Sequence, residues 1–232
     1  MLNPDQYLRY LEEKSAAQPP EPEAGVVLIT DPAEIEAFEQ QSGLTAGILP
    51  NAPYYDFCMD VYRSAKTNQY YRYCNVVYSK QGAAVLVLLR TEQQAYFLLN
   101  RQYRPLLRKI VYEIPRGFSD PTDPNAAYTA IRELAEETNI NLSEAEEHSF
   151  QMTELGTLHP DSGLTNNHAA LFLAELRLHS APEPAVQDVN ETILGHLLVT
   201  EQQLSEMIAD DRITDAFTLA AYARYQSRKG TT

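Results

Sequence analysis

The first apolar pattern along the chain is helical. Over residues 3–14, Tyr7, Leu8 and Leu11 fall on one face at the spacing of an α-helix. Asn3 can cap the first turn, and Pro4 suits the first helical position, where no backbone N–H is needed. The pattern therefore predicts a short N-terminal helix that buries one side.

A break in the pattern follows, and then a second helix start. Residues 15–25 are rich in proline, alanine and glutamate, a composition that predicts an extended linker. Asp31, Pro32 and Glu34 then combine a cap, a first-turn proline and an acid near the helix N-terminus. Gly43 is expected to end this helix, because glycine adopts the left-handed backbone of a C-cap without strain.

From about residue 54 the pattern changes to strands. Runs of aromatic, β-branched and apolar residues alternate with polar turns, as expected for strands that pack on a core. The strands predicted in this way are Tyr70–Tyr78, Ala83–Leu89, Ala95–Asn100, Ile110–Ile114, about 150–158, Ala169–Leu176 and Ile193–Val199.

Three helices interrupt or follow these strands. The clearest covers about 124–138, and two more close the chain, with Thr200 and Thr214 as their predicted caps. Strands, a central helix, more strands and terminal helices predict a mixed α/β domain. We expect residues 1–50 to form an N-terminal extension and residues 51–232 to form the main domain.

Charge narrows the classes of partner. The chain of 232 residues has a formal net charge of −14 and a pI of about 4.7, so its average field repels nucleic acid. Five basic residues nevertheless fall within sixteen positions, either as a solvated loop or as a local anion site: Arg101, Arg104, Arg108, Lys109 and Arg116. No apolar run approaches the roughly 18 residues that span a membrane. The cysteines, Cys58 and Cys74, are expected to be free thiols.

The central helix carries the candidate chemistry. Asp123 is its predicted cap, and an apolar stripe that includes Ile131 and Leu134 recurs on one side. Glu133, Glu136 and Glu137 point to the opposite side, one turn apart, where like charges repel. Such a cluster is either a solvated helix face or a set of oxygen ligands for a hard cation such as Mg²⁺.

A family signature decides between these interpretations. Gly117 begins the segment GFSDPTD, and Arg132 begins RELAEETNI; together they resemble the Nudix box. The box has a glycine, five spacers, a glutamate, seven spacers and R-E-U-x-E-E-x-G-U, where U is apolar. This chain departs from it twice. Asp123 replaces the first glutamate with one extra residue before Arg132, and Asn139 replaces the last glycine, a mild change in a left-handed position.

The resemblance extends over residues 54–226. The segments NRQYR at 100–104 and VYEIPRGF at 111–118 are similar to those of ADP-ribose pyrophosphatase-like Nudix hydrolases. That likeness implies an α/β/α sandwich with a mixed sheet, preceded here by a partly helical extension. It also implies a homodimer. Cytoplasmic location is expected because the N-terminus has neither a basic nor a long apolar stretch.

The same resemblance implies a reaction and a site. Such proteins cleave, by metal-assisted attack of water, the diphosphate of a nucleoside diphosphate linked to another group, here ADP-ribose or a nucleotide sugar. Glu133, Glu136 and Glu137 would bind Mg²⁺ or Mn²⁺, and Gly117 and Arg132 would support the box. The general base is expected to be Glu191, with Glu183 as a second candidate and Glu137 also in a catalytic role; Glu191 is otherwise an exposed loop acid.

Arg104 and Arg116 are the expected substrate contacts, because a guanidinium can clamp a phosphate with two bonds; either can equally pair with a carboxylate. Two alternative functions stay open. The altered box suits a module that binds ADP-ribose or a nucleotide as a sensor without cleaving it. Residues 1–50 could instead serve a protein interaction, with the remaining domain as scaffold. No nucleic-acid or membrane partner is expected.

Overall fold

The protein divides into two compact units. The computed structural model describes residues 1–17, 26–52, 55–104, 106–140, 150–179 and 193–229. The first unit comprises Met1–Ser79 together with Asp161–Asn167, and the second comprises Lys80–Pro160 together with His168–Thr232. This division falls later than the boundary expected near residue 50, because the strands up to Tyr78 pair with one another in a sheet of their own.

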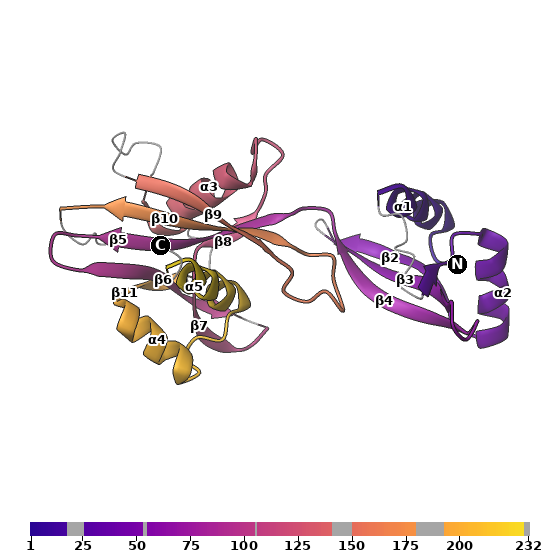
Figure 1. Cartoon of the computed structure of the whole chain (residues 1–232). Helices are drawn as coiled ribbons and strands as arrows, with labels where there is room; N and C mark the ends of the chain where they lie inside the picture. Colours follow the sequence, from indigo (N-terminus) through magenta and orange to yellow (C-terminus); the bar gives the residue numbers. More distant parts are fainter. Residues whose placement is uncertain (18–25, 53–54, 105, 141–149, 180–192, 230–232) are drawn as a thin grey trace. The chain divides into compact units, whose positions relative to one another are not determined.

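The first unit is a four-stranded antiparallel sheet with two helices (Figure 1). Its elements are α1 (Pro4–Ala17), β1 (Val26–Leu28), α2 (Pro32–Ser42), β2 (Gly47–Ala52), β3 (Tyr55–Ser64) and β4 (Tyr70–Tyr78). Both predicted helices are confirmed, and so are the cap at Asp31 and the left-handed Gly43, whose φ is 68°. The core of the unit joins the helices to the sheet through Tyr7, Ile35 and Cys58.

The pairing partners of this sheet were not predicted. β3 lies in the middle, with β4 along one edge and β1 and β2 along the other. The side chain of Asn166 accepts from the backbone N–H of Tyr78 and donates to its carbonyl. The segment Asp161–Asn167 therefore lies beside β4 and extends the sheet. Cys58 and Cys74 are free thiols, and burial, followed by the charge of Asp60, raises the pKa of Cys58 to about 12.

The second unit contains a seven-stranded mixed sheet. Its strands are β5 (Gly82–Arg90), β6 (Ala95–Arg104), β7 (Lys109–Glu113), β8 (Arg116–Phe118), β9 (Phe150–Leu158), β10 (Ala169–Arg177) and β11 (Ile193–Val199). They lie in the order β11-β6-β5-β10-β9, with β7 on β6 and β8 on β5. β5 and β10 pair in parallel, whereas the other neighbours are antiparallel.

Helices cover both faces of this sheet. Along β5, Val85 and Val87 pack toward α3 (Ala126–Thr138), whereas Leu86 and Leu88 pack toward α4 (Glu201–Ala209) and α5 (Ala216–Lys229). Figure 1 shows α3 on one side of the sheet and α4 and α5 on the other. β5 is buried from Ala83 to Leu89 because both of its faces are covered, and its alternating side chains build the expected α/β/α sandwich. No helix in the described ranges is long and apolar enough to cross a membrane.

Two predicted helix caps are wrong. Asn125, not Asp123, caps α3, and its side-chain oxygen accepts from the backbone N–H of Tyr128. Asp215, not Thr214, accepts from the N–H of the third residue of α5. Thr200 caps α4 as predicted, in a reciprocal capping box with Gln203. The cap at α3 moves by two residues because Asp123 bonds to other groups, described below.

Candidate active site

Three neighbouring strands of the second sheet present polar side chains to α3. Asn100 on β6 lies opposite His196 on β11 and opposite Glu113 on β7. Residues directly opposite one another point to the same face of a sheet. Leu98, two residues before Asn100, packs on the α3 side, so this polar row lies beneath α3.

The acids of α3 occupy different environments. Glu133 and Glu137 are buried, whereas the Glu136 side chain is 51% exposed. A Cβ atom added to Gly117 would lie 2.2 Å from the carboxyl carbon of Glu133, so this carboxylate lies directly on the glycine. Glycine at position 117 therefore makes room for a carboxylate, which gives the first residue of the box a physical role.

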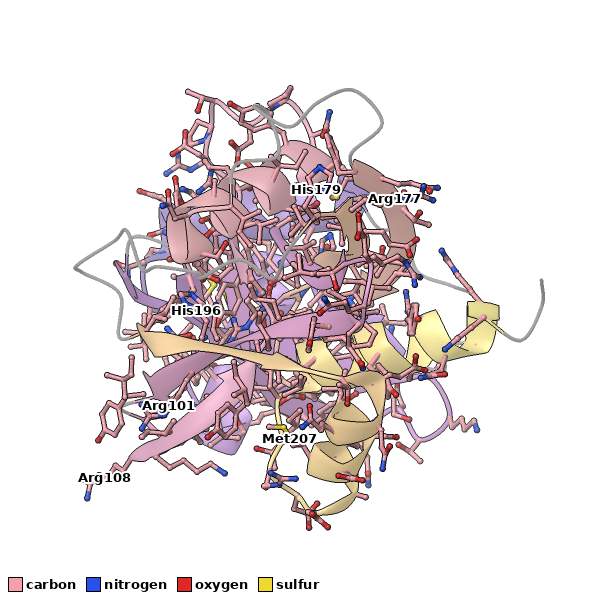
Figure 2. The ribbon with its side chains drawn as sticks, turned by 90° about the vertical axis from the view of Figure 1, so that its left-hand side faces the viewer. Arg101, Arg108, Arg177, His179, His196 and Met207 are labelled. Carbon is pink, nitrogen blue, oxygen red and sulfur yellow. The ribbon has the colours of Figure 1, made fainter. Side chains whose placement is uncertain are left out.

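Glu137 is contacted from two strands. The Asn100 amide donates to its Oε2 at 2.6 Å, and Nε2 of His196 lies 2.8 Å from its backbone carbonyl. Figure 2 shows His196 on the α3 side of β11. Neither Asn100 nor His196 was predicted as a site residue, because neither belongs to the box, although Asn100 begins the segment NRQYR.

Arg132 joins the helix to the loop before it. Its guanidinium bonds to Asp123 at 3.1 and 3.2 Å and to the carbonyl of Phe118 at 2.9 Å. It also lies 2.9 Å from Glu133 and 2.8 Å from Glu136. These contacts tie together both halves of the box, and the structural role of Arg132 stays a prediction.

Asp123 takes a structural position instead of capping α3. Its carboxylate accepts from Arg132, from the backbone N–H of Asp120 and from the hydroxyl of Thr129. The hydrogen bond from Arg132 is the largest cause that lowers the pKa of Asp123 to about 2. This aspartate stands where the signature has its first glutamate, counted from Gly117, and it holds loop and helix together.

The two arginines expected to bind substrate both contact Glu113. Arg104 makes two bonds of 2.8 Å to this buried carboxylate, and Arg116 makes one of 3.0 Å. The guanidinium of Arg116 also stacks on Phe217 at 4.5 Å. Arg101, Arg108 and Lys109 are exposed on the β6–β7 hairpin, where Figure 2 labels the two arginines. The basic cluster thus separates into an ordered pair and a solvated group.

The donor set suits a hard divalent cation in its chemistry. Carboxylate oxygens are the ligands that Mg²⁺ prefers, and Gly117 leaves space where a side chain would displace Glu133. Among the described residues, no three acidic, histidine or cysteine side chains are grouped as around a metal ion. Glu136 pairs with Arg132, whose guanidinium also contacts Glu133, so one arginine joins two of the three acids.

The expected general base, Glu191, and the second candidate, Glu183, lie outside the described residues. Their assignment stays a prediction. Glu113, by contrast, is a buried acid for which no site role was predicted, although it lies in the segment VYEIPRGF. The sequence signal for Glu113 was an acid at the end of an apolar strand, with Lys109 before it and Arg116 after it.

Comparison with known proteins places these contacts in a family context. A family model described as the NUDIX domain matches residues 80–215, which begins where the second unit begins. Nudix hydrolase 14, a chloroplastic protein of Arabidopsis thaliana, is 38% identical over 68 residues, covering 29% of this chain and 22% of that protein. An uncharacterized Nudix hydrolase of Schizosaccharomyces pombe is 31% identical over 102 residues, covering 44% and 45%. The chain thus spans less than half the length of either relative.

A solved structure shows the same fold. The crystal structure of an ADP compounds hydrolase matches with a TM-score of 0.61 at 15% identity, covering 81% of this chain and 94% of that chain. At this identity the likeness concerns the fold, and it confirms the expected sandwich.

Proposed function

Because the chain belongs to the Nudix family, we propose that it hydrolyses the diphosphate bond of a nucleoside diphosphate linked to another moiety. The observation that carries the proposal is the pair of buried carboxylates, Glu133 and Glu137, on the face of α3 beside Gly117. Buried acids one turn apart repel each other; Arg132 lies 2.9 Å from Glu133, and a bound divalent cation would add further positive charge at this face.

Glu133, Glu137 and Glu136 would hold Mg²⁺, or Mn²⁺, which when bound neutralises charge on the phosphates. In the reaction the oxygen of water bonds to one phosphorus and the bridging P–O bond breaks. Two monophosphates leave, and the proton of the water passes to a base. We assign that base to Glu191, and we also give Glu137 a catalytic role.

Arg104 and Arg116 are the proposed phosphate contacts. In the described residues Arg104 bonds to Glu113 through Nε and Nη2, which leaves Nη1 outside this pair. The Nε of Arg116 is buried with no hydrogen-bond partner among the described residues, and such a donor is costly unless a ligand meets it. Glu113 neutralises one of the two positive charges, so the group keeps one net positive charge for an anionic substrate.

ADP-ribose or a nucleotide sugar is the proposed substrate class. The segments NRQYR and VYEIPRGF motivate the choice, and the structural neighbour, an ADP compounds hydrolase, supports an adenosine diphosphate group. A homodimer and a cytoplasmic location stay predictions.

The test is a substrate panel with purified full-length protein. ADP-ribose, GDP-mannose, NADH, diadenosine polyphosphates and nucleoside triphosphates are incubated with Mg²⁺ or Mn²⁺, and release of monophosphate is measured with and without EDTA. We expect metal-dependent turnover of ADP-ribose or a nucleotide sugar, with loss in Glu137→Gln. Hydrolysis in ¹⁸O-labelled water identifies which phosphorus is attacked. Turnover that EDTA leaves intact would contradict the proposal.

The second candidate is a sensor that binds ADP-ribose or a nucleotide without hydrolysis. The altered box favours it, because Asp123 and Asn139 stand where the signature has a glutamate and a glycine. Binding measured by calorimetry without turnover on the panel would support this function over the first.

A further inference from the structure

Glu137 is held at two atoms by residues on neighbouring strands. Asn100 donates to its carboxylate at 2.6 Å, and His196 contacts its backbone carbonyl at 2.8 Å. Asn100 and His196 are themselves opposite one another in the β6–β11 ladder. One pair of facing positions therefore reaches both the side chain and the main chain of a single glutamate.

Chemistry assigns the donors in both contacts. An ionised carboxylate and a carbonyl oxygen can only accept hydrogen bonds. The Asn100 amide must therefore present Nδ2 to Glu137, and His196 must carry a proton on Nε2. The carbonyl of Glu137 belongs to the last turn of α3, where carbonyls lack a partner within the helix, so His196 also satisfies a helix end.

An irregularity in β11 brings His196 into register. Ile193 pairs with Gln102, but His196 pairs with Asn100, so β11 uses three steps where β6 uses two. This is a β-bulge, a device that changes which face a side chain takes. Gly195 stands inside it with a φ of 140°, a backbone conformation that other residues rarely adopt.

The side chain of Asn100 is not explained by its packing in the core of the second unit. It is 1% exposed, and within the described residues its Oδ1 is buried without a hydrogen-bond partner. An unsatisfied buried acceptor costs about 1–3 kcal/mol. Leu98, two positions earlier on the same face, shows that an apolar residue suits this side of β6. The amide at position 100 is therefore explained by its bond to Glu137 rather than by core stability.

We propose that Asn100 and His196 are positioning residues that together set the direction in which the Glu137 carboxylate meets a divalent cation. The inference rests on the proposed function and adds two residues from outside the Nudix box to its metal site. Residues that orient a ligand in this way typically change metal affinity about 10–100-fold when they are replaced.

The test measures metal binding separately from turnover. Mn²⁺ is titrated into the full-length protein and free Mn²⁺ is followed by electron paramagnetic resonance. For Asn100→Leu we expect an Mn²⁺ dissociation constant about 10–100-fold above that of the unchanged protein. We also expect a reduced kcat that partly recovers at high Mg²⁺, with little change in the KM for substrate. Glu137→Gln serves as the reference for loss of the site.

Two further variants separate positioning from folding. His196→Phe keeps an aromatic ring without the donor, whereas His196→Gln keeps an N–H donor, so Mn²⁺ affinity should fall in the first and recover in part in the second. Asn75→Leu is the matched control, because Asn75 makes the same kind of bond to Asp60 in the other unit. It should leave Mn²⁺ affinity unchanged. Thermal unfolding in EDTA fixes a temperature at which every variant is folded.

The outcomes distinguish this inference from the proposed function. If Glu137→Gln loses Mn²⁺ binding while Asn100→Leu and His196→Phe stay within twofold of the unchanged protein, the positioning role is wrong and the metal site stands. Weakened Mn²⁺ binding in both variants without turnover of any panel substrate supports the positioning role and contradicts the hydrolase. A protein that binds no Mn²⁺ contradicts both.

Discussion

Each of the two units buries a carboxylate that accepts a bond from an asparagine amide. In the first unit, Asn75 donates to Asp60 at 3.1 Å. In the second, Asn100 donates to Glu137 at 2.6 Å. Asp60 is fully buried and Glu137 is 4% exposed, so both carboxylates have left bulk water.

The two carboxylates differ in how charge is compensated. Lys14 lies 2.7 Å from Asp60, and the hydroxyl of Tyr10 donates to the same oxygen. On α3, three glutamates share a helix with one basic residue, Arg132, which also binds Asp123. The first arrangement is a neutral pair that fixes α1 on β3, whereas the second concentrates negative charge beside Gly117. A closed ion pair is typical of structure, and an acidic excess is typical of cation binding.

The largest expected effect comes from exchanging each carboxylate for its amide. Glu137→Gln should lower kcat about 10²–10⁴-fold, because a ligand and catalytic group is lost, with little loss of stability since a repulsion is relieved. Asp60→Asn should leave Lys14 without its counterion and cost about 2–4 kcal/mol of unfolding free energy. The Mn²⁺ affinity of Asp60→Asn should equal that of the unchanged protein. Steady-state kinetics measure kcat, denaturant unfolding measures the unfolding free energy, and titration measures the Mn²⁺ affinity. A loss of Mn²⁺ affinity in Asp60→Asn would contradict the purely structural role of Asp60.

A pair of glycine substitutions sharpens the contrast next. In Gly117→Ala the new Cβ would meet the Glu133 carboxylate at 2.2 Å, and the carboxylate, as the end of a flexible side chain, would have to move away. We expect Mn²⁺ affinity to fall about tenfold or more, with a change of unfolding free energy below about 1 kcal/mol. Gly43→Ala is the control. It has open space but a φ of 68°, so it should cost about 1 kcal/mol and leave Mn²⁺ affinity intact. Equal Mn²⁺ affinities in both variants would argue against the role of Gly117.

Acid unfolding tests the role of Asp123, whose carboxylate holds the loop before α3 to the helix through Arg132 and Thr129. Its pKa is lowered to about 2, first by the hydrogen bond from Arg132, from an ordinary value near 3.8. A depressed pKa contributes stability that is present above about pH 4 and is lost as the pH falls through about 4 to about 2. Asp123→Asn should therefore be less stable at pH 7 and lose less stability across that window. Denaturant unfolding at a series of pH values measures it, and parallel pH profiles for the two proteins would contradict the assignment.

The smallest effect is expected at the helix end. Asn139 is left-handed, with a φ of 60°, where the family signature has glycine. Asn139→Gly should change unfolding free energy by less than about 1 kcal/mol, because asparagine already tolerates this conformation. Turnover and Mn²⁺ affinity should stay within twofold of the unchanged protein. A larger loss would show that the asparagine side chain itself supports Glu137, two residues earlier.

Local pattern predicted much of the secondary structure. The strands Tyr70–Tyr78 and Ile193–Val199 have the predicted bounds, because alternation and turn residues act within a few positions. The caps at Asp31 and Thr200 were predicted for the same reason. The cap of α3 was not, since Arg132, nine residues away, draws the Asp123 carboxylate from the helix end. A contact outside the first turn decided between two candidate capping residues, Asp123 and Asn125.

The sequence by itself determined the acids of α3, the glycine beside them and the family they indicate, because those residues lie within one short segment of regular periodicity. Only the tertiary structure decided which groups meet those acids. Asn100 and His196 reach Glu137 because β6 and β11 pair through a bulge under α3. Glu113 reaches Arg104 because β6 and β7 form a hairpin. β6 and β11 lie far apart in sequence, and which strands become neighbours depends on the whole sheet rather than on the pattern within one strand.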